Sequence, residues 1–194
     1  LNEGNVVQSV NFKHTNVIGN AITAVDFFNS WAVDEIIVLD VSRTTENRQN
    51  FHKIIRGLSK RCFVPLTVGG WIKNIEEMKI FLKEGVDKIC INTEAVKNNS
   101  LIEESSKFFG SQCIVVSIDV KKNKNNEYEV FVDRGRESTG MNPINWAKKI
   151  EKLGAGEILL TSIDKEGTKQ GYDLELLKMI SKNVSIPVIS FGGV

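Results

Sequence analysis

The sequence predicts an α/β fold, a (β/α)8 or TIM barrel built from two half-barrels. Strand-like and helix-like segments alternate along the whole chain, the strands are apolar on both faces, and two strand motifs recur at one spacing. Strands of this kind form parallel sheets covered by helices. A doubly wound open sheet is the alternative, which the repeat and the absence of a G-x-G-x-x-G turn both weaken.

Two pairs of segments carry the repeat. Residues 33–38 resemble residues 155–160, and the glutamates of these segments, Glu35 and Glu157, are 157 − 35 = 122 positions apart. Residues 64–70 resemble residues 186–193, and their prolines are 187 − 65 = 122 positions apart. Chance likeness of short apolar strands is the competing explanation. Equal spacing at two places favours a duplicated half instead.

Each expected element follows from local patterns. The strands are residues 6–12, 35–40, 63–68, 88–91, 113–119, 128–132, 157–161 and 187–190, and the helices are residues 21–30, 47–59, 74–84, 100–109, 142–153 and 174–183. Asn74, Asp173 and the pair Asn142-Pro143 are typical of helix N-termini. The chain opens in a hairpin whose first arm would lie mostly before Leu1.

Six of these strands belong to the barrel, and four strands per repeat predict a total of eight. One strand would then precede Leu1 and one would follow Val194. The expected organisation is therefore a single barrel domain over residues 1–194, truncated at both ends.

Composition is that of an ordinary globular protein, with 194 residues of which 41% are hydrophobic. The 25 basic residues nearly balance the 24 acidic ones, so no net field attracts nucleic acid or a membrane surface. No apolar run approaches the roughly 18 residues of a membrane span. Cys90 and Cys113 fall inside expected strands and no C-x-x-C pair exists, which indicates packed thiols and a cytoplasmic protein. Only two histidines are present, and no metal site or cofactor is expected.

Polar groups follow the expected strands at their C-terminal ends, where barrel enzymes keep their active sites. The clearest case is segment 154–173, although an ordinary strand-to-helix connection has the same composition. Gly-Gly pairs follow alternate strands in both halves, and they either form tight turns or offer backbone N–H groups to anions. Two such cradles would suit a bisphosphate. The expected substrate-binding residues are Gly70, Asn92, Thr93, Thr161, Gly167, Gly192 and Gly193.

Asp119 is the expected catalytic residue. It ends the most apolar strand of the chain, where burial would raise the pKa of a carboxyl group towards the range of general acid–base catalysis. Its partner under the repeat would be the residue before Leu1. The alternative is a structural aspartate whose hydrogen bonds only hold the following hairpin.

Glu35, Lys88 and Glu157 stand at strand starts, near the expected floor of the barrel. Charges at such positions are usually solvated strand ends. Three of them at equivalent levels would also be able to form an ion-paired ring through which something small passes.

Residues 65–70, 87–93, 109–119 and 154–173 resemble the cyclase subunit family of imidazole glycerol phosphate synthase, and the likeness covers essentially the whole chain. The resemblance implies a lyase of histidine biosynthesis that forms a heterodimer with a glutaminase, a glutamine amidotransferase subunit docked at the barrel floor. Ammonia from that partner would react with a phosphoribulosyl formimino-aminoimidazole carboxamide ribonucleotide. The products would be imidazole glycerol phosphate and an aminoimidazole carboxamide ribotide.

The same resemblance implies a role for individual residues. Asp119 looks like one of two catalytic aspartates. Phosphate-site positions match Asn92, Thr93, Gly167, Gly192 and Gly193, an ammonia gate matches Glu35, Lys88 and Glu157, and a glutaminase contact matches Asp87.

Some residues depart from the family pattern. Trp71 replaces the third glycine of a phosphate-binding Gly-Gly-Gly, Gln8 replaces a lysine and Glu166 an aspartate. These changes, with residues 6–13 and 61–65, are more similar to a sister branch that passes ammonia to an amidotransferase making acetamidino sugars for surface polysaccharides. That branch is the alternative function. A third possibility is a docking platform that only stimulates its glutaminase, in which Asp119 would have no part in turnover.

Overall fold

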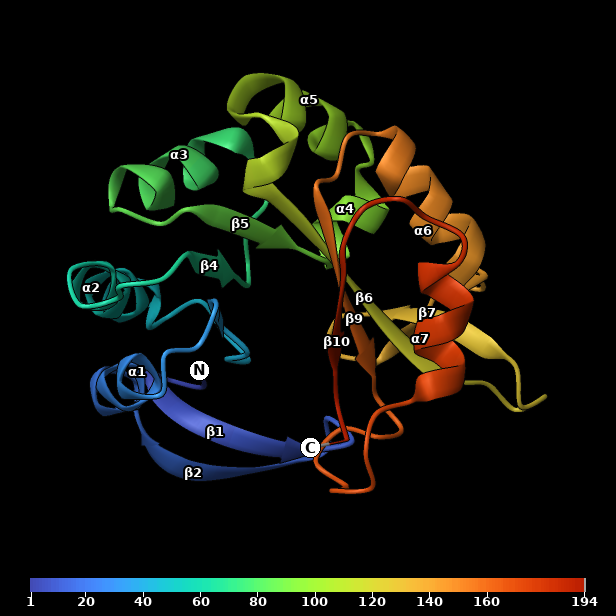
Figure 1. Ribbon diagram of the computed structural model, residues 1–194, viewed down its shortest axis with the longest axis horizontal. Coiled ribbons are helices and arrows are strands. Elements are labelled where there is room, and N and C mark those ends of the chain that lie inside the picture. The colour runs from blue at the N-terminus through green and yellow to red at the C-terminus, as the bar shows by residue number, and fades with distance from the viewer. Residues whose placement is uncertain (194) are drawn as a thin grey trace. The chain divides into compact units, whose positions relative to one another are not determined.

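The structure, a computed structural model, describes residues 1–193 and forms two compact units (Figure 1). The first unit comprises Leu1–Gln8 and Asn16–Cys90, and the second comprises Ser9–Thr15 and the chain from Ile91 onward. In both units parallel strands alternate with helices. The α/β class and the alternation of strands and helices expected from the sequence are therefore confirmed.

The first unit is built on three parallel strands in the order β3 (Ile36–Leu39), β4 (Leu66–Gly69) and β5 (Lys88–Ile91). Its helices are α1 (Ala21–Ser30), α2 (Arg48–Ser59) and α3 (Ile75–Lys83), and α1 packs against α2. The core consists of apolar side chains that the strands and helices bury together, among them Phe51, Ile55, Leu58, Leu66, Val68, Met78, Phe81 and Ile89.

The second unit has three parallel strands, with β9 (Glu157–Ser162) between β6 (Ile114–Lys122) and β10 (Val188–Phe191). The long strand β6 continues into an antiparallel pairing with β7 (Tyr128–Val132), which also pairs with β8 (Glu137–Ser138). Helices α4 (Thr93–Lys97), α5 (Ser100–Phe109), α6 (Pro143–Lys152) and α7 (Leu174–Ser181) and the 3-10 turn η1 (Ser111–Cys113) complete the unit. Figure 1 shows α6 and α7 beside the strands, where α6 contacts β6 and α7 contacts β10.

The predicted repeat is visible in the strand registers. In the first unit Ile36 pairs with Leu66, and in the second unit Ile158 pairs with Val188. Both members of the second pair lie 122 positions after their counterparts, since 158 − 36 = 122 and 188 − 66 = 122. A register shift of one residue would exchange the two faces of a strand. The identical register is therefore structural evidence for a duplicated half.

Several element predictions were wrong in detail. The strand predicted from residue 63 begins at Leu66, because Pro65 has no backbone N–H for a ladder and Phe63 is 87% exposed. Cys113 lies in η1 and not in a strand. Helix α4 and strand β8 were not expected, because five and two residues are too short to show a period.

The opening hairpin contains a strand that was not predicted. Strand β1 (Asn5–Val10) pairs with β2 (His14–Asn20), which follows it. An arm before Leu1 stays a prediction. All seven residues of β2 are exposed, so the strand lacks the alternation of apolar and polar residues by which strands are recognised.

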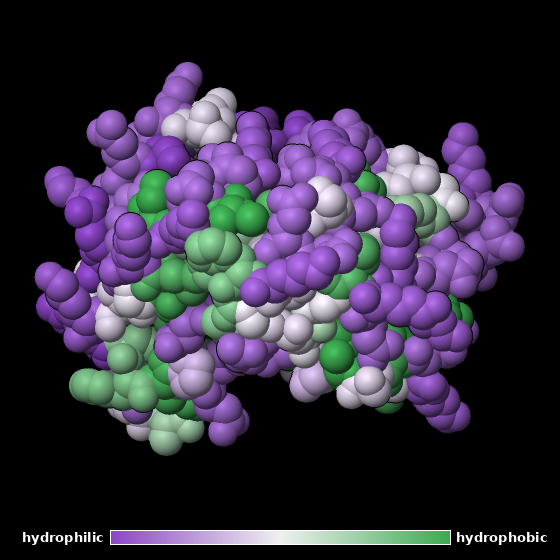
Figure 2. Space-filling model, turned by 90° about the horizontal axis from the view of Figure 1, so that it is seen from above, coloured by the Kyte–Doolittle hydropathy of each residue, from purple (hydrophilic) through white to green (hydrophobic). Residues whose placement is uncertain are grey.

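The predicted helix caps are confirmed. Asn74 accepts a hydrogen bond from Glu77 N at 2.9 Å, and Asp173 accepts one from Leu176 N at 3.1 Å. Figure 2 shows a face on which hydrophilic side chains predominate, with apolar groups between them. Within residues 1–193, none of the helices is long and apolar enough to span a membrane.

Candidate functional site

Asp119 lies near the C-terminal end of β6, and only 7% of its surface is exposed. The side-chain amide of Asn92 donates a hydrogen bond to its Oδ2 at 2.8 Å, and the hydroxyl of Ser117 donates one to Oδ1 at 3.2 Å. The Thr161 side chain makes a third hydrogen bond. Asn92 follows β5 and Thr161 belongs to β9, so side chains from three separate segments hold one carboxyl group.

Burial raises the pKa of Asp119 to about 6. The hydrogen bonds from Asn92, Ser117 and Thr161 act in the opposite direction, because they stabilise the charged carboxylate, and the negative charge of Glu166 adds slightly to the rise. The rise in pKa that the sequence predicts is confirmed. A carboxyl group with this pKa both takes up and releases a proton near neutral pH, as general acid–base catalysis requires.

Glu166 is a second buried carboxylate. The sequence marked it as a polar group of segment 154–173 and as a departure from the family pattern, without a catalytic role. The hydroxyl of Ser9 donates to its Oε1 at 3.0 Å, and Asn11 N donates to its carbonyl oxygen at 2.9 Å. Burial raises the pKa of Glu166, and the hydrogen bond from Ser9 opposes the rise. Ser9 and Glu166 are 157 positions apart, so no local pattern could have revealed their contact.

The residues expected to bind phosphate occupy different environments. Asn92 is directed to Asp119 and therefore belongs to the carboxylate cluster. The hydroxyl oxygen of Thr93 accepts a hydrogen bond from Asp133 N at 3.0 Å, while Thr161 is buried beside Asp119. A Cβ at Gly167 would lie 1.9 Å from the carbonyl oxygen of Ser9, so the close approach of two backbones requires glycine there.

Gly70 and Gly192 are equivalent in the repeat, since 192 − 70 = 122, and their φ angles of +98° and +97° agree. The next equivalent pair is Trp71 and Gly193, with φ angles of +57° and +104°. Tryptophan thus occupies a left-handed backbone position whose counterpart is glycine. Its indole Nε1 donates to the carbonyl oxygen of Ser42 at 3.0 Å.

Two of the expected gate residues are paired in the first unit. Lys88 Nζ lies 2.9 Å from Glu35 Oε2, and both side chains are about four-fifths buried, at 18% and 20% exposure. The Thr67 hydroxyl donates to the other oxygen of Glu35 at 2.5 Å. Glu157 begins β9 in the second unit, and the three-residue ring stays a prediction.

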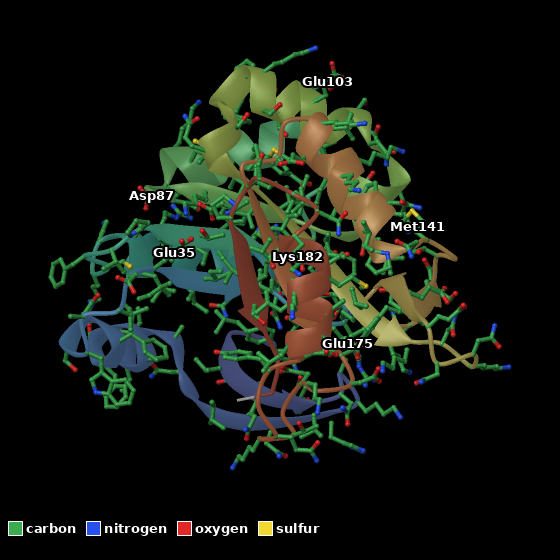
Figure 3. The ribbon with its side chains drawn as sticks, turned by 45° about the vertical axis from the view of Figure 1, so that its right-hand side comes forward. Glu35, Asp87, Glu103, Met141, Glu175 and Lys182 are labelled. Atoms are coloured by element: carbon green, nitrogen blue, oxygen red, sulfur yellow. The ribbon has the colours of Figure 1, made fainter. Side chains whose placement is uncertain are left out.

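Asp87 precedes β5, and its Oδ2 accepts a hydrogen bond from Leu66 N at 2.8 Å. Figure 3 labels Asp87 and Glu35, which stand at the N-terminal ends of β5 and β3. These ends are opposite to those that carry Gly70 and Asn92, as the sequence predicts for residues of a barrel floor.

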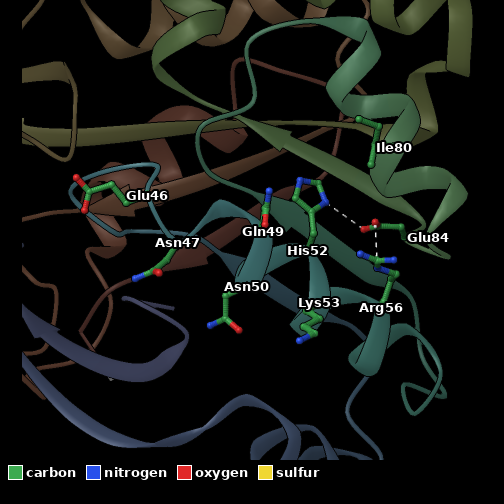
Figure 4. Close-up of a pocket in the computed structure, with 9 residues that line it drawn as sticks. All are labelled: Glu46, Asn47, Gln49, Asn50, His52, Lys53, Arg56, Ile80 and Glu84. Carbon is green, nitrogen blue, oxygen red and sulfur yellow. Dashed lines mark hydrogen bonds and ion pairs between the residues drawn. The ribbon is translucent and has the colours of Figure 1, made fainter.

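A separate hollow of 660 Å³ lies beside α2 and α3 (Figure 4). Within it Glu84 is hydrogen-bonded to His52 Nδ1 at 3.3 Å and forms an ion pair with Arg56 at 3.4 Å. None of the predicted site residues lines it. The hollow therefore does not take part in the candidate site.

A family described as histidine biosynthesis protein has a sequence model that matches residues 1–194. The chain belongs to this family. Among its relatives are imidazole glycerol phosphate synthase subunits HisF of Clostridium botulinum (strain Okra / Type B1), 49% identical over 191 residues, and of Bacillus cereus (strain ATCC 10987 / NRS 248), 47% identical over 193 residues. HisF of Methanocaldococcus jannaschii is 44% identical over 212 residues. These matches cover 98%, 100% and 100% of this chain and 76%, 77% and 78% of the relatives.

Family membership confirms the fold class and the enzyme class expected from the sequence. It also confirms the expected function, that of a subunit of imidazole glycerol phosphate synthase in histidine biosynthesis. The name of these relatives, a synthase subunit, implies a partner subunit, so the existence of a partner is confirmed but its chemistry is not. The roles of single residues and the chemistry of the partner are proposals.

Proposed function

We propose that the chain catalyses the cyclase reaction of this synthase, with Asp119 as its general acid–base group. The substrate is a phosphoribulosyl formimino-aminoimidazole carboxamide ribonucleotide, and ammonia converts it to imidazole glycerol phosphate and an aminoimidazole carboxamide ribotide. The observation that carries the proposal is the Asp119 carboxyl group, which is buried, has a pKa of about 6 and accepts hydrogen bonds from three side chains.

Closing an imidazole ring with ammonia requires protons to be removed from the attacking nitrogen and added to the groups that leave. A single carboxyl group that exchanges its proton near neutral pH performs both steps in turn. Asn92 and Ser117 restrict the orientation of the carboxylate, so that one oxygen is directed to each donor. In this proposal Asn92 is a positioning residue as well as a substrate ligand.

The substrate carries phosphate groups, and we assign their binding to residues at the C-terminal ends of strands. Thr93 offers a hydroxyl proton, because its oxygen already accepts the Asp133 N–H. Gly192 and Gly193 have no side chain, so an anion is able to approach their backbone N–H groups without contact with a Cβ. Gly70, Thr161 and Gly167 complete the proposed substrate-binding set.

We further propose that the partner subunit is a glutaminase that supplies the ammonia. Glu35, Lys88 and Glu157 would form the ammonia gate, and Asp87 would contact the partner. The paired and largely buried Glu35 and Lys88 support a gate, because a solvated strand end needs no such pair. A cytoplasmic location is part of the same proposal.

The test is turnover of the bisphosphate substrate with ammonium salt and without glutaminase. Asp119→Asn is expected to lose about 10²–10⁴-fold in kcat, the usual range for a general acid–base group. Asp26→Asn is the matched control, because Asp26 is half exposed and forms an ion pair with Arg61, which is also half exposed. Full turnover by Asp119→Asn would refute the catalytic role.

Trp71 favours a second candidate function, the passing of ammonia to an amidotransferase of acetamidino-sugar synthesis. Trp71 occupies the position that is equivalent to Gly193 in the repeat, where glycine would leave the most room for a phosphate. The same assay separates the two candidates. A folded wild-type protein that shows no turnover of the bisphosphate with ammonium salt would favour the second.

A further inference from the structure

The turn between β7 and β8 has an unusual backbone. Its residues Asp133, Arg134 and Gly135 have φ angles of +50°, +59° and +73°, so three successive residues are left-handed. This conformation is unfavourable for residues with a Cβ. Strained backbone of this kind persists where surrounding contacts hold it, and it concentrates at functional sites.

Contacts on two sides hold the turn in place. At its start, Asp133 N donates to the Thr93 hydroxyl at 3.0 Å. At its other end, a Cβ on Gly135 would lie 2.9 Å from the side chain of Ile163 and 3.3 Å from the ring of Phe12, so this glycine packs directly against both. All of these residues belong to the second unit.

These contacts place the turn across the strand ends that hold Asp119. Asn92 and Thr161 form hydrogen bonds with the Asp119 carboxylate. The two residues that contact the turn lie close to them in sequence, since Thr93 directly follows Asn92 and Ile163 comes two residues after Thr161. In addition, Asp119 pairs with Phe131, which is two residues before the turn. The turn therefore contacts residues that lie one or two positions after those of the carboxylate cluster.

Two arginines belong to this turn, and their side chains differ in their surroundings. Arg136 Nη2 lies 2.5 Å from Asp133 Oδ2, and the side chain of Arg136 is 59% exposed. Arg134 Nη2 lies 3.3 Å from Asp133 Oδ1, and the side chain of Arg134 is only 25% exposed. Arg136 makes the shorter ion pair at the surface, whereas Arg134 has the longer one and is the more enclosed.

We propose that Arg134 is a specificity-determining residue that binds a phosphate group of the substrate together with the Thr93 hydroxyl. A guanidinium presents two parallel N–H donors to phosphate oxygens, and such charge-assisted bonds are stronger than neutral ones. The inference rests on the proposed function, because the phosphate is that of the proposed substrate. Asp133 holds the turn by its N–H and balances the charge of Arg134 when no phosphate is bound.

The first test compares Arg134→Asn with Arg136→Asn in the ammonium-dependent reaction. Asparagine tolerates the left-handed conformation, so the substitution at Arg134 keeps the backbone of the turn. We expect the KM of Arg134→Asn for the bisphosphate substrate to rise about tenfold or more, with kcat within about twofold of the wild type. Arg136→Asn removes the same charge from the same turn and should change KM less than about twofold, and Arg134→Lys should fall between. Equal KM values for the two asparagine variants, or a KM for Arg134→Asn equal to that of the wild type, would overturn the proposal.

A second measurement does not depend on turnover. Inorganic phosphate should raise the melting temperature of the wild type and of Arg136→Asn, and it should raise that of Arg134→Asn much less. If the wild type shows no turnover but this difference is found, the proposed reaction fails and the phosphate site stands. Equal protection of all three proteins by phosphate would overturn the role of Arg134 whether or not turnover is seen.

Discussion

Replacing Asp119 by asparagine should change how the stability of the chain depends on pH. The pKa of Asp119 is raised from its ordinary 3.8 to about 6 in the folded chain. The folded state therefore binds this proton more tightly than the unfolded state does. Between pH 4 and pH 6 the unfolded chain loses the proton first, so the contribution of Asp119 to the free energy of unfolding falls as the pH rises and levels off above pH 6.

The size of this effect follows from the two pKa values. Each pKa unit corresponds to about 1.4 kcal/mol, so a carboxyl raised from 3.8 to about 6 costs the folded wild type about 3 kcal/mol at pH 7. Asparagine has no proton to lose, and the variant lacks this decline. An asparagine also satisfies fewer of the donors around position 119, which lowers stability by about 1–3 kcal/mol, but this loss is the same at every pH.

The assay is urea denaturation of both proteins at intervals between pH 4 and pH 8. We expect the free energy of unfolding of Asp119→Asn, minus that of the wild type, to increase by about 2 kcal/mol between pH 4 and pH 7, because a part of the change has already taken place at pH 4. All other titrating groups are common to both proteins and largely cancel in the difference. Asp26→Asn, which changes an exposed aspartate, should give a curve parallel to that of the wild type. If the free energy of unfolding of Asp119→Asn also changed with pH in parallel with that of the wild type, the conclusion that burial raises the pKa of Asp119 would be refuted.

Three further substitutions test packing, pairing and strain. Gly167→Ala should lower the free energy of unfolding, measured in urea, by about 3 kcal/mol, because the added Cβ would lie 1.9 Å from a backbone oxygen. Gly171→Ala has nothing within 4 Å of the added Cβ and should lower it by about 1 kcal/mol. Equal losses would contradict the packing argument. Lys88→Met should lower the free energy of unfolding by about 2 kcal/mol, because the Glu35 carboxylate loses its ammonium partner. The double variant with Glu35→Gln should recover most of this loss, and no recovery would show that the pair is unimportant. Trp71→Gly should relieve about 1 kcal/mol of left-handed strain and lower the KM for the bisphosphate several-fold, and an unchanged KM would show that the indole does not crowd the phosphate site.

Much of the fold was predictable from short-range patterns. Apolar runs and N-caps such as Asn74 and Asp173 located most helices and strands, because these signals act within one or two turns of the chain. The spacing of 122 positions predicted a duplication, and the pairings of Ile36 with Leu66 and of Ile158 with Val188 agree with it. Elements without such signals, like the exposed strand β2, were missed.

The candidate site was only partly predictable. Asp119 could be chosen because it lies towards the end of an apolar strand, which continues to Lys122 in the structure, and its burial and raised pKa agree with that position. Its hydrogen bond with Asn92 agrees with the rule that parallel strands bring their C-terminal ends together. The paired Glu35 and Lys88 agree with the same rule at the opposite strand ends.

By itself, then, the sequence determined the α/β class, the repeat, the family and the choice of Asp119. Only the tertiary structure showed that Ser9 binds Glu166, 157 positions away, and that the turn at Arg134 crosses to Thr93 and Ile163. The physical reason is that patterns and caps are local, whereas a contact between loops depends on backbone angles that the local sequence disfavours. The left-handed conformation of Asp133 and Arg134 is of this kind, because the packing around the turn and not the preference of its residues holds it.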